Sequence, residues 1–204
     1  MSKLSTRDKI INASINMFYR HGYAGARTSE IAKEAGCAEG TIFRYFPKKI
    51  DLLKNVAEEF IVRFAGGIAT KTLYEILEKS EDMTSEELLE AVLRDRFKLV
   101  KENYELIKIM FYEINFHEEV KEMFISNFME NIQGIGHQLT RSLSKKLGTD
   151  ELEEMTVIRT IIGQMMGIFI QSALVPGDRN GENLEEMIQT TAQIIINGLK
   201  GAVQ

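Results

Sequence analysis

Residues 28–46 read TSEIAKEAGCAEGTIFRYF, a pattern of two short helical segments on either side of Gly36. The first helix is expected over residues 29–35, with Thr28 as its N-cap and Gly36 at its end. The second covers about residues 39–45. Two helices of this length joined by a glycine-containing turn are typical of a helix-turn-helix, although packed pairs of short helices also occur in other α-proteins.

The two segments have one apolar side and one polar side. The residues expected on the apolar side are Ile31, Ala35, Cys37, Ile42, Phe43 and Phe46. Glu39, Thr41 and Arg44 project from the other face, where a recognition helix meets base edges in the major groove. Gly40 lacks a side chain and would let the backbone come close to DNA. The pattern therefore predicts a DNA-reading helix.

The charge distribution favours the same interpretation. The chain of 204 residues has a net charge of −5, which taken whole argues against nucleic acid. However, residues 1–54 contain ten Lys or Arg and five Asp or Glu, whereas residues 55–204 contain 15 and 25. Such asymmetry indicates a basic module that meets an anion and an acidic remainder, with chance scatter of charge as the alternative.

Residues 6–53 resemble the TetR (tetracycline-repressor-like) family of bacterial regulators. The resemblance is carried by residues 28–32, by residues 35–46 and by KIDLL at residues 49–53. It includes the family's run of glycine, hydrophobic and aromatic residues ending in Phe, here GTIFRYF, followed within three residues by Lys. One departure is Ala38, where the family often has a serine N-cap, which implies a weaker cap for the second helix.

The resemblance implies how DNA is held. Thr28 would bind a phosphate at a helix N-terminus, and Tyr45 and Lys49 would bind further phosphates. Arg44 is a candidate for bidentate pairing with guanine. Glu39 is a candidate base reader, although an acidic residue there can also exclude wrong sequences or stay solvated. The expected DNA-binding residues are Arg27, Thr28, Glu39, Gly40, Thr41, Arg44, Tyr45, Lys48 and Lys49.

The whole chain is predicted to be all-α, with about nine helices. It contains only two prolines, so few positions interrupt a helix. Ser5 and Asp8 are spaced as a capping box for a first helix that Gly22 ends. After the helix-turn-helix, the expected helices cover about residues 48–78 (with a break at Gly66-Gly67), 85–101, 103–114, 117–147, 150–175 and 182–200.

The resemblance also implies two domains. Residues 1–54 would bind DNA, with the boundary inside the fourth helix, and residues 55–204 would bind a ligand and dimerise. The last two helices would pair with a second protomer as a four-helix bundle, so that a two-fold dimer reads a palindrome. The apolar stripes assigned to this interface are Ile158, Ile161, Met165, Ile168, Met187, Ile188, Thr191, Ile195 and Leu199.

The middle helices would enclose a mainly apolar pocket for a small hydrophobic effector. The residues expected to line it are Met110, Phe111, Phe124, Phe128, Met129, Met166 and Phe169. Taken one by one, each of them is more simply explained as an ordinary core residue. The expected function is a homodimeric repressor that its effector releases from DNA. A regulator that needs its ligand, an activator, or a helical small-molecule carrier that binds no DNA are the alternatives.

Catalytic motifs are not evident. The sequence HEEVK at residues 117–121 has Lys121 where a zinc-protease motif needs its second histidine. The single cysteine, Cys37, excludes an intramolecular disulfide framework. We therefore expect no enzyme activity, no cofactor and no metal. No secretory signal is visible and the most apolar run, residues 160–175, is too short to span a membrane, so we expect a cytoplasmic protein.

Overall fold

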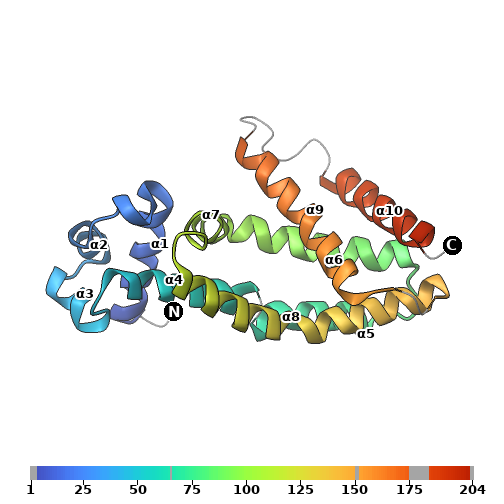
Figure 1. Cartoon of the computed structure of the whole chain (residues 1–204), viewed down its shortest axis with the longest axis horizontal. Helices are drawn as coiled ribbons and strands as arrows, with labels where there is room; N and C mark the ends of the chain where they lie inside the picture. Colours follow the sequence, from blue (N-terminus) through green and yellow to red (C-terminus); the bar gives the residue numbers. More distant parts are fainter. Residues whose placement is uncertain (1–3, 65, 150–151, 175–183, 203–204) are drawn as a thin grey trace. The chain divides into compact units, whose positions relative to one another are not determined.

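The computed structural model describes residues 4–64, 66–149, 152–174 and 184–202, with the side chains of residues 68, 127–131, 168, 172–174 and 202 excepted. Every regular element in the described ranges is a helix, as the sequence predicts (Figure 1). There are ten in the described part, because the long segment after Pro47 forms two. They are α1 (Thr6–Gly25), α2 (Thr28–Ala35), α3 (Glu39–Tyr45), α4 (Lys49–Phe64), α5 (Gly67–Glu78), α6 (Ser85–Glu102), α7 (Tyr104–Glu113), α8 (Glu118–Leu147), α9 (Glu154–Leu174) and α10 (Leu184–Ala202).

The helices pack as two compact units. Unit 1 comprises Met1–Gly66 and Asn103–Met129, and unit 2 comprises Gly67–Glu102 and Glu130–Gln204. Unit 1 therefore contains α7 and the first part of α8 in addition to the N-terminal helices. Among the described helices, none is long and apolar enough to cross a membrane.

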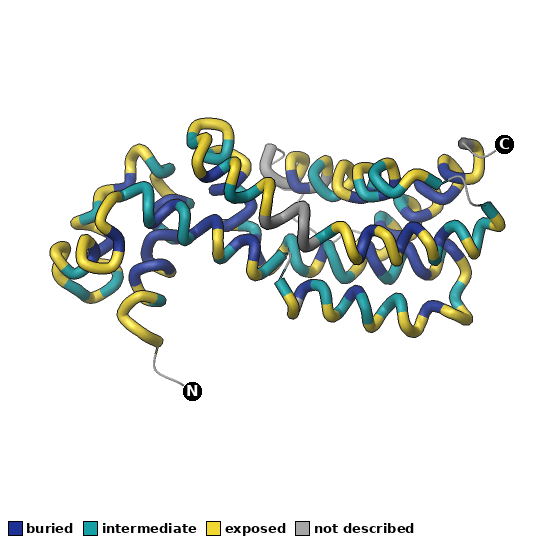
Figure 2. The backbone as a smooth tube through the Cα atoms, turned by 60° about the horizontal axis from the view of Figure 1, so that its bottom comes forward, coloured by how far each residue is buried: buried dark blue, intermediate teal, exposed yellow. Residues whose placement is uncertain are grey.

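Unit 1 is built around α1, which packs against α2, α4 and α7. The predicted capping box is present: the Asp8 N–H donates to Ser5 Oγ and the Ser5 N–H donates to Asp8 Oδ2, both at 3.2 Å. The buried stripe of α1 includes Ile10, Ile15 and Phe18 and follows the spacing of one helix face. Figure 2 shows buried and exposed positions alternating along the helices. This stripe fixes α1 as the support on which α2 and α4 are positioned.

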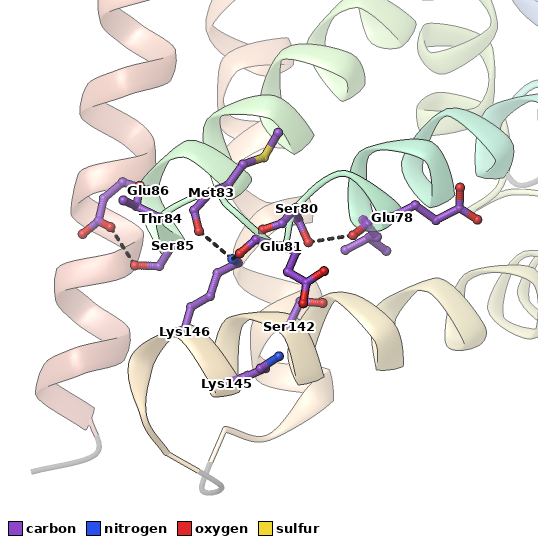
Figure 3. A pocket seen from close by; sticks show the side chains of 11 residues that line it. Glu78, Ser80, Glu81, Met83, Thr84, Ser85, Glu86, Ser142, Lys145 and Lys146 are labelled. Atoms are coloured by element: carbon purple, nitrogen blue, oxygen red, sulfur yellow. Dashed lines mark hydrogen bonds between the residues drawn. The ribbon is translucent and has the colours of Figure 1, made fainter.

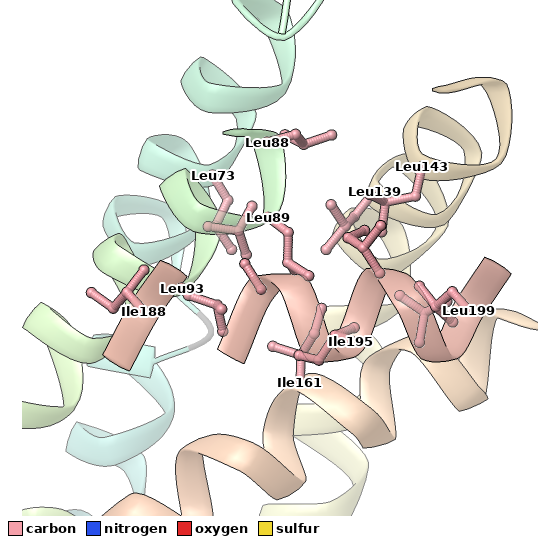
Figure 4. Close-up of a cluster of buried hydrophobic side chains, with 14 of the residues drawn as sticks. Leu73, Leu88, Leu89, Leu93, Leu139, Leu143, Ile161, Ile188, Ile195 and Leu199 are labelled. Carbon is pink, nitrogen blue, oxygen red and sulfur yellow. The ribbon is translucent and has the colours of Figure 1, made fainter. Parts of the chain in front are cut away.

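Unit 2 has its own apolar core, to which α5, α6, α8, α9 and α10 all contribute (Figure 4). Helix α6 lies centrally, since it packs against α5, α9 and α10. The predicted break at Gly66-Gly67 is confirmed, because α4 ends at Phe64 and α5 begins at Gly67. The most deeply buried large side chains of this core are Leu88, Leu89, Leu93, Leu143, Ile188 and Ile196.

Candidate nucleic-acid interface

The helix-turn-helix predicted for residues 28–46 is present in unit 1. Gly36 ends α2 in the left-handed conformation, with φ of 69° and ψ of 37°, and its N–H donates to the carbonyls of Ala32 and Lys33. Glycine adopts this conformation without the steric cost of a Cβ. Ile31 and Ile42 are fully buried and Phe46 nearly so, so the inner faces of α2 and α3 belong to the unit 1 core.

Phe43 does not belong to the apolar side, contrary to the sequence prediction. Its side chain is 44% exposed, whereas Ile42 and Phe46 are buried. Ile42 and Phe46 are four residues apart and share one helix face, while Phe43 lies about 100° around the axis from Ile42. That spacing was the signal that separates Phe43 from the core. Helix α3 thus exposes an aromatic ring together with Glu39 and Arg44.

The start of α2 differs from the prediction in one respect. Thr28 is the first helical residue rather than the N-cap, which is Arg27. The Thr28 hydroxyl instead donates to Glu39 Oε1 at 2.6 Å, so it connects the starts of α2 and α3. Arg27 makes no side-chain cap with any described group. Two of the expected DNA-binding residues are thus in direct contact with each other.

The start of α3 is close to what the sequence predicts. Ala38 occupies the N-cap position and makes no side-chain cap to described residues, as expected from the absence of serine. A Cβ built on Gly40 would meet no described atom within 4 Å. The described residues therefore leave room for a side chain at position 40.

The cations at the start of α4 have different surroundings. The Lys48 side chain is exposed, and its backbone N–H donates to Asp51 Oδ2 at 2.8 Å. Lys49 Nζ instead donates to the Tyr23 carbonyl and, at 3.4 Å, to the Ala24 carbonyl. Burial lowers the pKa of Lys49. Lys49 thus stabilises the end of α1 in addition to any contact with phosphate.

The residues predicted to line an effector pocket lie in both units. In unit 1, Met110 is buried, Phe111 is exposed, and the Phe124 ring packs on Phe60 at 5.4 Å between centroids. In unit 2, Met166 is half-buried and Phe169 is buried. The side chains of Phe128 and Met129 lie outside the described residues. Their common role in a pocket stays a prediction.

A cavity of about 640 Å³ in unit 2 is of a different kind (Figure 3). It lies between the α5–α6 connection and the last part of α8, and its lining contains glutamate, serine and lysine side chains but none of the predicted pocket residues. Lys146 Nζ donates to the carbonyls of Ser80 at 2.6 Å and Met83 at 2.5 Å. Lys146 therefore fixes the connection between α5 and α6.

The predicted dimer residues divide into two groups. Four are buried in the unit 2 core of the single chain: Ile161, Ile188, Ile195 and Leu199. Four others are half-buried: Ile158, Met165, Met187 and Thr191. The side chain of Ile168 lies outside the described residues. The four buried residues leave little surface for a partner, so the core of the single chain explains their apolar periodicity. Their contact with a second protomer stays a prediction.

Comparison with known proteins finds relatives of the helix-turn-helix region. Residues 10–56 match the family model described as bacterial regulatory proteins, tetR family. The Fatty acid metabolism regulator protein of Bacillus subtilis is 27% identical over 147 residues, which cover 70% of this chain and 72% of that protein.

Solved structures share the fold over nearly the whole chain. The fatty acid degradation regulator FadR from Bacillus halodurans has a TM-score of 0.69 at 24% identity and covers 98% of this chain and 99% of its own. FadR from Bacillus subtilis in complex with stearoyl-CoA has a TM-score of 0.65 at 21% identity, over 97% of this chain and 100% of its own.

The fold and the exposed α3 define a helix-turn-helix transcriptional regulator. Residues 10–56 carry the DNA-binding segment of the TetR family of bacterial regulatory proteins. The function of the chain is that of a DNA-binding transcriptional regulator.

Proposed function

We propose that this regulator is a repressor which binds a palindromic operator as a homodimer and is released by an elongated apolar effector. The observation that carries the proposal is the exposed face of α3, where Glu39, Phe43 and Arg44 stand clear of the protein core. A helix inserted in the major groove needs such a face, because bases are read by side chains that reach their edges.

Within this proposal, the residues of the site have two kinds of role. Arg44 and Glu39 read base edges with Thr41, and Phe43 adds an apolar ring that suits a thymine methyl group. Phosphate contacts come from the flanking positions, which fix the register of the protein without reading sequence. The proposed phosphate-binding residues are Arg27, Thr28, Tyr45, Lys48 and Lys49, and Gly40 admits the DNA backbone. This DNA-binding part comprises residues 1–54.

Residues 55–204 supply ligand binding and dimerisation in this proposal. The outer faces of α9 and α10 support it, since Ile162, Ile170 and Ile194 are exposed there. Cβ atoms built on Gly163 and Gly198 of these helices would meet no described atom within 4 Å. A second copy seated on these faces would cover the apolar side chains, and the glycines would allow close helix approach. We therefore propose this outer surface as the dimer seam, continuous with the half-buried Met165 and Thr191.

The effector class rests on the relatives. Their names describe regulators of fatty acid metabolism or degradation, and one was solved with stearoyl-CoA. Long acyl chains suit surroundings rich in methionine and phenylalanine, of the kind predicted here, because methionine adapts to irregular apolar shapes. We propose a long-chain acyl compound as the effector. A ligand that prefers the conformation unable to bind DNA shifts the population toward it and releases the operator.

Selection from random-sequence double-stranded DNA tests the DNA-binding part of this proposal. The purified wild type should enrich a palindrome whose half-sites are about 34–36 Å apart or a multiple of that distance. On the enriched duplex, log K against log salt concentration should fall by roughly 0.9 for each phosphate contacted. A helical carrier would enrich no sequence, and either that result or a flat salt response would contradict the proposal.

Stearoyl-CoA added to the protein–operator complex tests the effector. Release of the duplex at micromolar stearoyl-CoA, with no release by CoA alone, would support a repressor relieved by an acyl ligand. Tighter binding would favour the alternative in which the ligand acts as corepressor. An unchanged affinity would contradict the proposed effector class while leaving the DNA-binding function intact.

A further inference from the structure

The contact between Thr28 and Glu39 has a consequence for DNA binding. Thr28 is the first residue of α2 and Glu39 the first of α3, and 2.6 Å separates the donor Oγ1 from the acceptor Oε1. A threonine hydroxyl has a single proton to donate. While that proton is given to Glu39, the hydroxyl cannot donate it to a phosphate oxygen.

The charge of Glu39 acts in the same direction as this competition. A phosphate that takes the place of the carboxylate at Thr28 would lie only a few ångströms from a like charge unless Glu39 moves away. Both side chains have access to solvent, Glu39 being exposed and Thr28 half-buried, so the pair can open without unpacking the core. Any duplex that uses the Thr28 hydroxyl must therefore first break this hydrogen bond.

What the freed carboxylate meets depends on the sequence of the DNA. A carboxylate accepts a hydrogen bond from the amino group of cytosine or of adenine, whereas the major-groove edges of guanine and thymine offer only acceptors, which repel it. At a duplex with a cytosine or adenine amino group in reach, Glu39 regains the hydrogen bond that it loses when Thr28 turns to a phosphate. At other duplexes Glu39 finds no new donor, and its carboxylate stays close to the phosphates without a hydrogen bond.

We propose that Glu39 is a specificity-determining residue that acts mainly by weakening the binding of non-operator DNA. The inference rests on the proposed function, because it compares operator with non-operator DNA. Breaking the Thr28–Glu39 hydrogen bond is compensated at the operator and is not compensated at other duplexes. Specificity is a difference between two affinities, and a feature that penalises the wrong partner raises it as effectively as one that favours the right partner.

The variant Glu39→Gln tests this inference, since glutamine can still accept from Thr28 but carries no charge. Binding should be measured on the selected operator and on a scrambled duplex of equal length. We expect affinity for the scrambled duplex to rise about fivefold for each bound protomer, the effect of one like charge at about 4 Å in water. Affinity for the operator should change less or fall, so the ratio of the two decreases.

Glu30→Gln is the matched control. Glu30 is an exposed acidic residue in the first turn of α2, and its replacement changes the net charge by the same amount. Thr28→Val removes the hydroxyl for which Glu39 and a phosphate compete. In this background, Glu39→Gln should raise the affinity for scrambled DNA much less than it does in the wild type. Thermal unfolding of each variant reports whether the helix-turn-helix remains folded.

Two results would overturn the inference. If Glu39→Gln changes scrambled-duplex affinity no more than Glu30→Gln does, the carboxylate imposes no penalty of its own. If it lowers affinity for both duplexes, the charge of Glu39 favours DNA binding instead of opposing it. Either result is distinct from failure of the proposed function, in which the wild type would bind neither duplex.

Discussion

The carboxylate of Glu113 accepts a hydrogen bond from the backbone N–H of Tyr23, with 3.0 Å between Oε1 and N. Tyr23 directly follows Gly22, whose φ of 69° interrupts α1, so its N–H falls outside the regular pattern of helix bonds. Lys49 donates to the carbonyl of the same Tyr23. Helices α7 and α4 therefore both bind one residue near the end of α1, and α7 is connected through it to the start of α4.

Glu113→Ala should weaken operator binding and lower the melting temperature. It leaves the part-buried Tyr23 N–H without its acceptor, which costs about 1 kcal/mol at such a site, and it loosens the segment that Lys49 holds. Glu113→Gln retains an acceptor oxygen and should stay close to wild type. Glu105→Ala removes an exposed acid from the same helix and serves as the control. Equal behaviour of Glu113→Ala and Glu105→Ala would contradict the connection.

Gly40→Ala should separate folding from DNA binding. The added Cβ meets no described atom within 4 Å, and alanine is favoured over glycine inside a helix by about 0.8–1.0 kcal/mol. We therefore expect an unchanged or higher melting temperature. Operator affinity should fall about tenfold, because the added methyl group would hold α3 further from the groove. About one bidentate contact between a side chain and a base edge would then be lost. Wild-type affinity in this variant would show that the DNA backbone does not approach Gly40.

Two neighbouring isoleucines of α10 distinguish the dimer seam from the core. Ile194 is 61% exposed, whereas Ile195 is 4% exposed and belongs to the unit 2 core. Ile195→Glu buries a charge without a partner and should unfold unit 2 at a cost of several kcal/mol. Ile194→Glu should remain folded, sediment as a monomer and lose specific operator binding. If Ile194→Glu dimerises as well as wild type, the seam lies elsewhere.

The stability of unit 2 should fall in acid through Glu86. Hydrogen bonds from the Ser85 hydroxyl at 2.6 Å and from Lys200 Nζ at 2.9 Å hold the pKa of Glu86 at about 2. Because this pKa lies below its value in the unfolded chain, the stabilisation is present above about pH 4.5 and is lost as the pH falls toward 2.

The Glu86 side chain is 37% exposed, so solvent screens the pair and the contribution should be about 1 kcal/mol or less. Urea unfolding at about pH 5 and pH 3 should show a smaller acid loss in Glu86→Gln than in wild type. Glu81→Gln, which removes an exposed carboxylate from the same unit, is the control. An acid loss of equal size in Glu86→Gln and wild type would contradict the assignment.

Local sequence signals predicted most of the secondary structure. The capping box at Ser5 and the turn at Gly36 are both present, because each depends on residues within a few positions of one another. Gly22 was expected to end the first helix, but it only kinks α1, which continues to Gly25. The exposure of Phe43 was also within reach, since helical spacing separates it from Ile42. The Thr28–Glu39 contact was not, because it depends on how α2 and α3 are oriented.

Apolar periodicity was least informative for α9 and α10. It identifies the side chains that leave water, such as Ile161 and Ile195, but it does not say which surface covers them. Here α6 and its neighbours cover them within one chain. The outer face of α10, with Ile194, carries too few apolar residues to stand out in the sequence. Contacts distant in sequence, such as that of Glu113 with Tyr23, likewise leave no local signal.

The central proposal is that α3 reads bases while its flanking cations hold phosphates. The decisive measurement compares Arg44→Ala and Lys48→Ala on a panel of single-base variants of the selected operator. Both side chains are exposed, and Lys48 is preferred to Lys49 because Lys49 also stabilises the end of α1. Lys48→Ala should weaken binding to every duplex about equally, whereas Arg44→Ala should lose about 1–3 kcal/mol of discrimination at one or two symmetric positions. Identical profiles for the two variants would contradict base reading by α3.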